Sequence, residues 1–252
     1  MNRYTEKINK IEFVVCDACT GNCRHCSEGE HIGKTNRLDP AKAAAVVTDV
    51  CRKYEVKTVM TFGGEPMLNP EAVYAIQKAA SEMGVPRRQL ITNGFFSRDR
   101  EVITEVVKRL AQSGVNDVLL SADAFHQEYI PIDIVRIFAE AAVREKLPIR
   151  LQPAWLVSRD HDNPYNKKTR DILAELSELG ISESDGNVIF PEGNALKYLS
   201  EYFDPNEKII NPYAESPEDI RTISVGADGE VLGGNINICG ILDIIAGYDP
   251  FR

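Results

Sequence analysis

Short apolar runs alternate with amphipathic stretches along most of the chain. Runs rich in β-branched residues predict strands, and apolar residues that recur every three or four positions predict helices. The Asp39-Pro40 and Asn69-Pro70 pairs mark two helix starts, because Asp and Asn cap a first turn and Pro fits the first helical position. The predicted strands are residues 11–15, 57–62, 89–92, 118–121, 148–156 and 187–190, and the predicted helices are residues 41–53, 70–83, 102–110, 132–145 and 169–179.

This alternation predicts an α/β fold. Because a strand, helix and next strand connect with a right-handed crossover, successive strands lie parallel. We therefore expect residues 1–190 to form a partial (β/α)6 barrel with parallel strands. Residues 191–252 break the alternation and are expected to form a C-terminal extension packed on the same domain. Within it, residues 222–225 and 231–233 flank Asp228-Gly229 and predict a β-hairpin.

Composition restricts the setting and the partners. The 252 residues fit one domain, and 43% hydrophobic with 27% charged residues is typical of a globular protein. A net charge of -9 provides no broad basic surface, so nucleic acid is not expected as a partner. No apolar run approaches the roughly eighteen residues that span a bilayer, and the N-terminus lacks the apolar stretch of a secretory signal. We expect a cytoplasmic protein without a membrane partner.

Four of the six cysteines lie within residues 16–26. Cytoplasmic thiols stay reduced, so this spacing favours metal binding over disulfides. Cys19, Cys23 and Cys26 form a C-x3-C-x2-C array. Three thiolates would leave one iron of a four-iron cluster open for another molecule, which is an arrangement suited to catalysis.

Cys16 leaves two alternatives open. It can complete a closed four-cysteine iron-sulfur site, as in a non-catalytic electron carrier or sensor. It can also pair with Cys19 in a zinc site that stabilises a binding module. Only three residues separate Cys19 from Cys23, whereas a dozen or so usually separate two zinc-binding pairs, and this spacing disfavours zinc.

A second motif, Gly63-Gly64-Glu65-Pro66, follows the second predicted strand. The carboxyl ends of barrel strands are where such folds place their chemistry. Adjacent glycines permit close backbone approach to a ligand, and Glu65 supplies a carboxylate for a cation. A plain turn between strand and helix is the alternative for this motif taken alone.

Further polar residues follow the third and fourth strands. Asn93 can contact a ligand or cap its turn. Ser121 and Asp123 can contact a ligand or cap a helix. His126 is a candidate acid or base, because its ordinary pKa is near neutrality, and a local hydrogen bond is the simpler role.

Together, the cysteine array and the Gly-Gly-Glu-Pro motif resemble the signature of the radical S-adenosylmethionine superfamily, C-x3-C-x-φ-C, with His25 where the family often has an aromatic residue. The resemblance implies a [4Fe-4S] cluster held by Cys19, Cys23 and Cys26, with the methionine part of S-adenosylmethionine on the open iron. The cofactor-binding residues that it implies are His25, Gly63, Gly64, Glu65, Pro66, Asn93, Ser121 and Asp123.

The resemblance also implies an activity. Such an enzyme would reductively cleave S-adenosylmethionine to a 5'-deoxyadenosyl radical, which would take hydrogen from a small-molecule or peptide substrate. We expect an oxygen-sensitive protein served by an electron donor of the flavodoxin or ferredoxin type. Cys239 is a packed thiol or a hydrogen-atom donor to a substrate radical. Adenine contact, substrate contact and simple packing remain equally open for Gln152, Trp155, Glu192 and Asn194.

Overall fold

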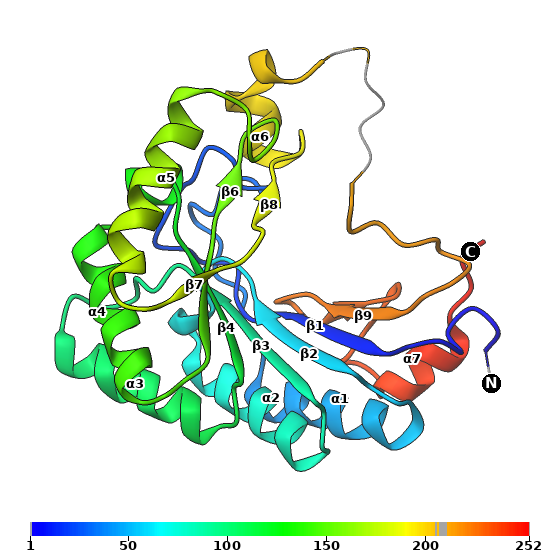
Figure 1. Cartoon of the computed structure of the whole chain (residues 1–252). Helices are drawn as coiled ribbons and strands as arrows, with labels where there is room; N and C mark the ends of the chain where they lie inside the picture. The colour runs from blue at the N-terminus through cyan, green and yellow to red at the C-terminus, as the bar shows by residue number, and fades with distance from the viewer. Residues whose placement is uncertain (1, 205, 207–210, 252) are drawn as a thin grey trace.

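A computed structural model describes residues 2–204, 206 and 211–251 (Figure 1). Its centre is a sheet of seven parallel strands in the order β7-β5-β4-β3-β2-β1-β9. The predicted α/β fold with a parallel sheet is therefore confirmed. The strands are β1 (Lys10–Val14), β2 (Thr58–Phe62), β3 (Arg87–Thr92), β4 (Asp117–Ser121), β5 (Ile149–Gln152), β7 (Ser182–Glu183) and β9 (Thr222–Val225).

Helices follow the strands and cover one side of the curved sheet (Figure 1). Asp39 caps the first of them, accepting a hydrogen bond from the Lys42 amide at 2.9 Å, as its sequence predicts. Among the described helices, none combines the length and apolar character that crossing a membrane requires. The helices are α1 (Pro40–Lys53), α2 (Pro70–Glu82), α3 (Arg100–Gln112), α4 (Ile132–Arg144), α5 (Pro164–Ser177), α6 (Gly193–Tyr198) and α7 (Ile241–Gly247), with 3-10 turns η1 (Pro66–Leu68), η2 (His126–Glu128) and η3 (Ser200–Tyr202).

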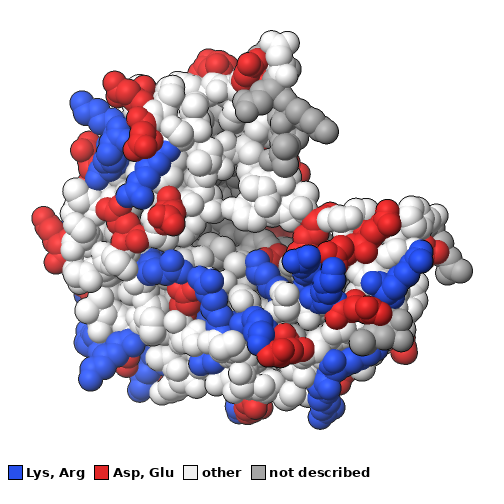
Figure 2. Space-filling view, turned by 45° about the vertical axis from the view of Figure 1, so that its right-hand side comes forward, with Lys and Arg blue, Asp and Glu red and all other residues white. Residues whose placement is uncertain are grey.

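The two faces of the sheet differ in burial. Phe13 of β1 is fully buried, and Thr61 of β2 accepts a hydrogen bond from Gln77 of α2, so these residues face the helices. Glu12 and Met60 lie opposite each other in the register and are only half-buried. Figure 2 shows the molecule hollowed on the side away from the helices. The barrel is therefore open along one side.

The fifth and sixth predicted strands differ from the structure. Residues 148–156 divide into β5 and β6 (Ala154–Trp155), because Pro153 has no N–H for a ladder. β6 pairs with β8 (Asn187–Val188) in a separate small sheet, so the prediction that residues 187–190 continue the main sheet is wrong. β7 holds that place beside β5 instead. Its residues are polar and exposed, so no hydrophobic pattern marked them.

The predicted hairpin also pairs differently. Residues 222–225 form β9, which lies parallel to β1, and not against residues 231–233. Ile223 and Val225 are fully buried there, and β9 covers an edge of β1 that would otherwise be unpaired. The extension does hold an antiparallel pair, but it joins β10 (Glu230–Val231) to β11 (Gly234–Asn235).

At the carboxyl edge of the sheet, the loop after β2 lies directly on the loop after β1. The amides of Gly64 and Glu65 each donate a 2.8 Å hydrogen bond, to the carbonyls of Cys16 and Ala18 respectively. A Cβ on Gly64 would lie 2.1 Å from the Ala18 oxygen. Gly63 has φ +146, and a Cβ there would lie 2.6 Å from the Cys16 oxygen. Both glycines are therefore required by this backbone contact.

The contact predicts a cost for Gly64→Ala. The added methyl group must push the two loops apart, which should lower stability by about 1–3 kcal/mol and the Tm by ~2–10 °C. Gly247→Ala is the matched control, because a Cβ at Gly247 meets no atom within 4 Å. Thermal unfolding by circular dichroism measures both. Equal Tm values for the two variants would show that the loops do not constrain each other.

Candidate active site

The three cysteines of the array lie on the loop after β1. Burial is the main factor that raises the pKa of each thiol, to about 12 for Cys19. The like charges of Cys19 and Cys26 also raise the pKa of Cys23, so the three sulfurs lie close enough to interact. Buried thiols of this kind become stable thiolates when a metal centre supplies positive charge. Their chemistry therefore fits a thiolate-bound cluster.

Cys16 has a different environment from the three cysteines of the array. Its side chain is fully buried, and its Sγ lies 3.1 Å from the carbonyl oxygen of Glu65 and 3.6 Å from that of Ala18. Burial raises the pKa of Cys16 to about 11, and the charges that act on it are those of Glu65, Arg37 and Asp17. The Cys16 thiol therefore donates to the Gly-Gly-Glu-Pro loop, and this contact disfavours a role as fourth ligand.

Several nitrogen-bearing groups lie close to the sulfurs of the array. The Gly21 amide donates to Cys19 Sγ at 3.4 Å, and Asn93 Nδ2 lies 3.8 Å from the same sulfur. His31 places Nε2 3.3 Å from Cys26 Sγ and Nδ1 2.7 Å from the Asp17 carbonyl. Contacts to cluster sulfurs are among the factors that set cluster potentials. Sequence reasoning missed His31, because it lies in a loop without any periodic or motif signal.

Glu65 ties the loop after β2 to the end of β3. Its carboxylate is fully buried. Oε1 accepts from the Met67 amide at 2.9 Å and the Thr92 hydroxyl at 2.7 Å, and Oε2 accepts from the Asn93 amide at 2.9 Å. Burial raises the pKa of Glu65 to about 7, although these hydrogen bonds act in the opposite direction. Glu65 therefore links the loop after β2 to the end of β3, and its Oε2 can accept one further hydrogen bond.

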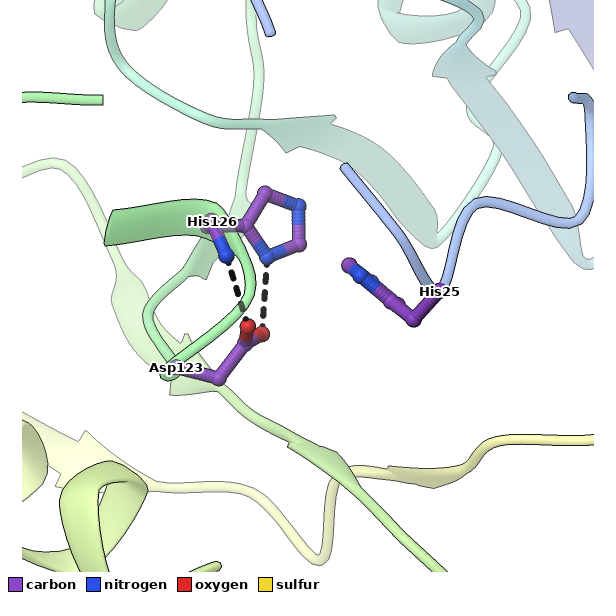
Figure 3. A group of neighbouring side chains, drawn as sticks. All are labelled: His25, Asp123 and His126. Atoms are coloured by element: carbon purple, nitrogen blue, oxygen red, sulfur yellow. Dashed lines mark hydrogen bonds and ion pairs between the residues drawn. The ribbon is translucent and has the colours of Figure 1, made fainter. Parts of the chain in front are cut away.

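After β4, the fully buried Asp123 pairs with the half-buried His126 (Figure 3). Asp123 Oδ1 accepts from the amides of Phe125 and His126, both at 2.9 Å. Its Oδ2 accepts from the Ala154 amide at 3.1 Å and lies 2.7 Å from His126 Nδ1. Burial raises the pKa of Asp123, but the charge and hydrogen bonds of His126 outweigh it and bring the pKa to about 2. The ionised carboxylate holds the proton of His126 on Nδ1 and leaves Nε2 as the basic atom.

His25 lies beside this pair, pointing toward it from the cysteine loop (Figure 3). Burial lowers the pKa of His25 to about 4, so the ring is neutral, and its Nδ1 has no hydrogen-bond partner among the described residues. His25 packs on Phe125 with ring centres 5.1 Å apart. The ligand atoms of His25, Asp123 and His126 lie within 4.8 Å of one another. Four hydrogen bonds already fill the Asp123 oxygens, so a pair that orients His126 describes the group better than a metal site.

The remaining candidates divide between this edge and the rest of the fold. Ser121 ends β4 and is buried, and Asn93 caps its own turn at the Phe95 amide while it also contacts Thr20. Asn194 reaches the cysteine loop. The others have contacts elsewhere: Trp155 donates to Asp185, Gln152 accepts from Ser184, Glu192 accepts from Asn211, and the exposed Cys239 contacts Asn235.

Several known proteins resemble this chain in sequence or in fold. A GTP 3',8-cyclase of Desulforamulus reducens is 24% identical over 162 residues, which is 62% of this chain and 48% of the relative. The chain thus spans about half the length of this curated relative. SuiB of Streptococcus suis, crystallised with S-adenosylmethionine, is 14% identical and covers 97% of this chain and 66% of its own, with a TM-score of 0.59. BtrN, in complex with AdoMet and 2-DOIA, is 18% identical and covers 98% of this chain and 85% of its own, with a TM-score of 0.54.

The family model of the radical SAM superfamily matches residues 13–195. That range begins in β1 and ends in α6, so it contains the cysteine loop, the Gly-Gly-Glu-Pro loop and the ends of β3 and β4. The structural neighbours agree with it in fold. The chain therefore belongs to the radical SAM superfamily, whose enzymes use a [4Fe-4S] cluster together with S-adenosylmethionine.

Proposed function

We propose that this chain is an enzyme that reductively cleaves S-adenosylmethionine and uses the resulting 5'-deoxyadenosyl radical to take hydrogen from a substrate. One observation carries the proposal: three interacting thiols, one buried and two half-buried, lie on the loop that packs against the Gly-Gly-Glu-Pro loop. Cys19, Cys23 and Cys26 would hold the cluster. The bound cluster and S-adenosylmethionine supply the electron transfer and the radical chemistry, and the protein supplies binding and orientation.

The residues around the thiols suit the two ends of the cofactor. The backbone of residues 63–66 and the free acceptor position of Glu65 Oε2 suit the methionine amino group. His25, neutral and packed on Phe125, offers a flat face of low polarity to the adenine end. Ser121 and the His126 ring suit the ribose side of the site, and Asp123 acts there through His126. Asn93 joins these parts, because it contacts both the Glu65 carboxylate and the cysteine loop.

His126 also suits proton transfer in the reaction. The Asp123 carboxylate fixes its ring, and the His126 side chain is 18% exposed. An oriented imidazole whose Nε2 is unprotonated can accept a proton from a substrate hydroxyl or amine. We expect a small-molecule or peptide substrate and an electron donor of the flavodoxin or ferredoxin type. The cytoplasm is the compartment we expect.

The competing function is a non-catalytic electron carrier or sensor with four cysteine ligands. It requires the Cys16 sulfur to turn toward the cluster. That movement would break the 3.1 Å contact of Cys16 with the Glu65 carbonyl beneath the Gly-Gly-Glu-Pro loop. The packing of Cys16 therefore favours the three-ligand, catalytic arrangement.

Two alanine substitutions separate these functions. Cys23→Ala removes a cluster ligand, so cleavage of S-adenosylmethionine should be abolished. Cys16→Ala removes only a packed thiol, so it should keep cleavage within a few-fold of the parental rate while lowering stability by about 1 kcal/mol. Iron content and 5'-deoxyadenosine formation after anaerobic reconstitution measure both effects. Cleavage that survives in Cys23→Ala and disappears in Cys16→Ala would contradict the ligand assignment.

His25 should make the stability of the metal-free chain depend on pH. Because burial lowers its pKa from 6.5 to about 4, the unfolded chain binds this proton more strongly than the folded chain. Above pH 6.5 His25 is neutral in both the folded and the unfolded chain, so it has no effect on the pH dependence of stability. As the pH falls from 6.5 toward 4, protonation of His25 favours the unfolded chain and stability is lost. His25→Phe should remove that loss, on the order of 1–2 kcal/mol at pH 5. Urea unfolding of both proteins at pH 5 and pH 7.5 measures the difference, and an equal difference at the two pH values would refute it.

A further inference from the structure

The segment that begins α6 lies on the cysteine loop, although 171 positions separate the two in sequence. Asn194 is 2% exposed. Its backbone amide donates to the Cys26 carbonyl at 2.8 Å, and its side-chain Nδ2 donates to the Cys23 carbonyl at 3.0 Å. One residue therefore binds the backbone of two of the three array cysteines.

These two bonds complete the hydrogen bonding of both carbonyls. The Cys23 oxygen also accepts from the Cys26 amide at 3.2 Å, and the Cys26 oxygen also accepts from the Gly29 amide at 3.3 Å. A carbonyl oxygen has two lone pairs, so each is now fully used. Without the Asn194 side chain, the Cys23 carbonyl would keep one bond from within its own loop, and that loop would lose a tie to the rest of the fold.

The neighbouring residues show that the contact is closely fitted. Gly193 has φ +54, and a Cβ there would lie 2.3 Å from the Ser27 oxygen and 2.6 Å from the Cys26 oxygen. Lys197 and Tyr198 both contact Glu30 Oε1, at 2.6 and 3.2 Å. Only a residue without a side chain fits beside the cysteine loop at position 193, so the backbone of this segment and Asn194 make the contact together.

We propose that Asn194 is a positioning residue, which keeps Cys23 and Cys26 in the geometry that retains the cluster. This role rests on the proposed function, because it concerns the same three thiolates. Asn194 acts through its hydrogen bonds to the cysteine backbone. It also explains why a residue outside both motifs is fully enclosed at this edge of the barrel. The side-chain amide of Asn194 already uses one N–H to bind the Cys23 carbonyl.

Two substitutions at Asn194 separate hydrogen bonding from packing. Asn194→Ala removes the donor and leaves a small cavity. Asn194→Asp keeps the volume but places a carboxylate oxygen against the Cys23 carbonyl. If donation matters, both variants should lose the reconstituted cluster to a chelator about tenfold faster than the parent, and Asp should be no better than Ala. Anaerobic decay of the cluster absorbance, with spin counts of the reduced cluster by EPR, measures the loss.

Asn166→Ala is the matched control. Asn166 is also fully buried, and its Nδ2 donates to the carbonyls of Leu156 and Ser158, within the segment that connects β6 to α5. The Asn166 side chain also donates to the His161 carbonyl and accepts from the Leu156 amide. Asn166→Ala should therefore destabilise the metal-free chain at least as much as Asn194→Ala does, while the cluster is lost at the parental rate. A cluster that leaves both alanine variants equally fast would overturn the proposal, because general destabilisation would then account for it.

Two other results are decisive. Retention of the cluster by Asn194→Asp at the parental rate would show that Asn194 fills space and does not position the cysteines. A parental chain that forms no cluster after reconstitution would refute the proposed function, and this role with it. The parental sample therefore distinguishes failure of the proposed function from failure of the Asn194 role.

Discussion

The close backbone contact between the loops after β1 and β2 is the constraint on which the rest of the site depends. Only glycine leaves room for the 2.8 Å hydrogen bonds that join Gly64 and Glu65 to the cysteine loop. That contact brings Glu65 beneath the end of β3, where its carboxylate binds Thr92 and Asn93. These hydrogen bonds join the carboxyl ends of β1, β2 and β3, and the three thiols lie at this edge of the sheet.

Negative charge on the buried groups of the site costs free energy when no metal centre is bound. Three thiols share a buried environment that raises their pKa, and Glu65 and Asp123 are fully buried carboxyl groups. Backbone amides and His126 compensate the carboxyl groups within the fold. The thiols have weaker partners, such as the Gly21 amide. A cationic iron-sulfur core would offset the negative charge of the three thiolates, which the protein compensates only weakly. The thiols, and not the carboxyl groups, therefore indicate the metal centre.

Sequence reasoning found the parts with a local signal. The Asp39 cap, the strands β1 to β4, the cysteine array and the Gly-Gly-Glu-Pro motif each depend on a few adjacent residues. The packing role of the glycines was not visible, because Gly64 makes room for a loop more than forty residues away. β7 was missed since its two residues are polar and exposed, and the pairing of β9 with β1 joins opposite ends of the chain. His31 lies in a loop without a motif, and the contact of Asn194 with the cysteine loop spans 171 positions that no spacing encodes.

Reductive cleavage of S-adenosylmethionine by the unaltered chain is the most direct test of the role of the three-thiol loop. The protein would be reconstituted anaerobically with iron and sulfide, reduced with dithionite and given S-adenosylmethionine, and the products would be separated by chromatography. We expect 5'-deoxyadenosine and methionine in equal amounts, and only when the reductant is present. A cluster that is reduced normally but yields neither product would contradict this expectation and would favour an electron carrier.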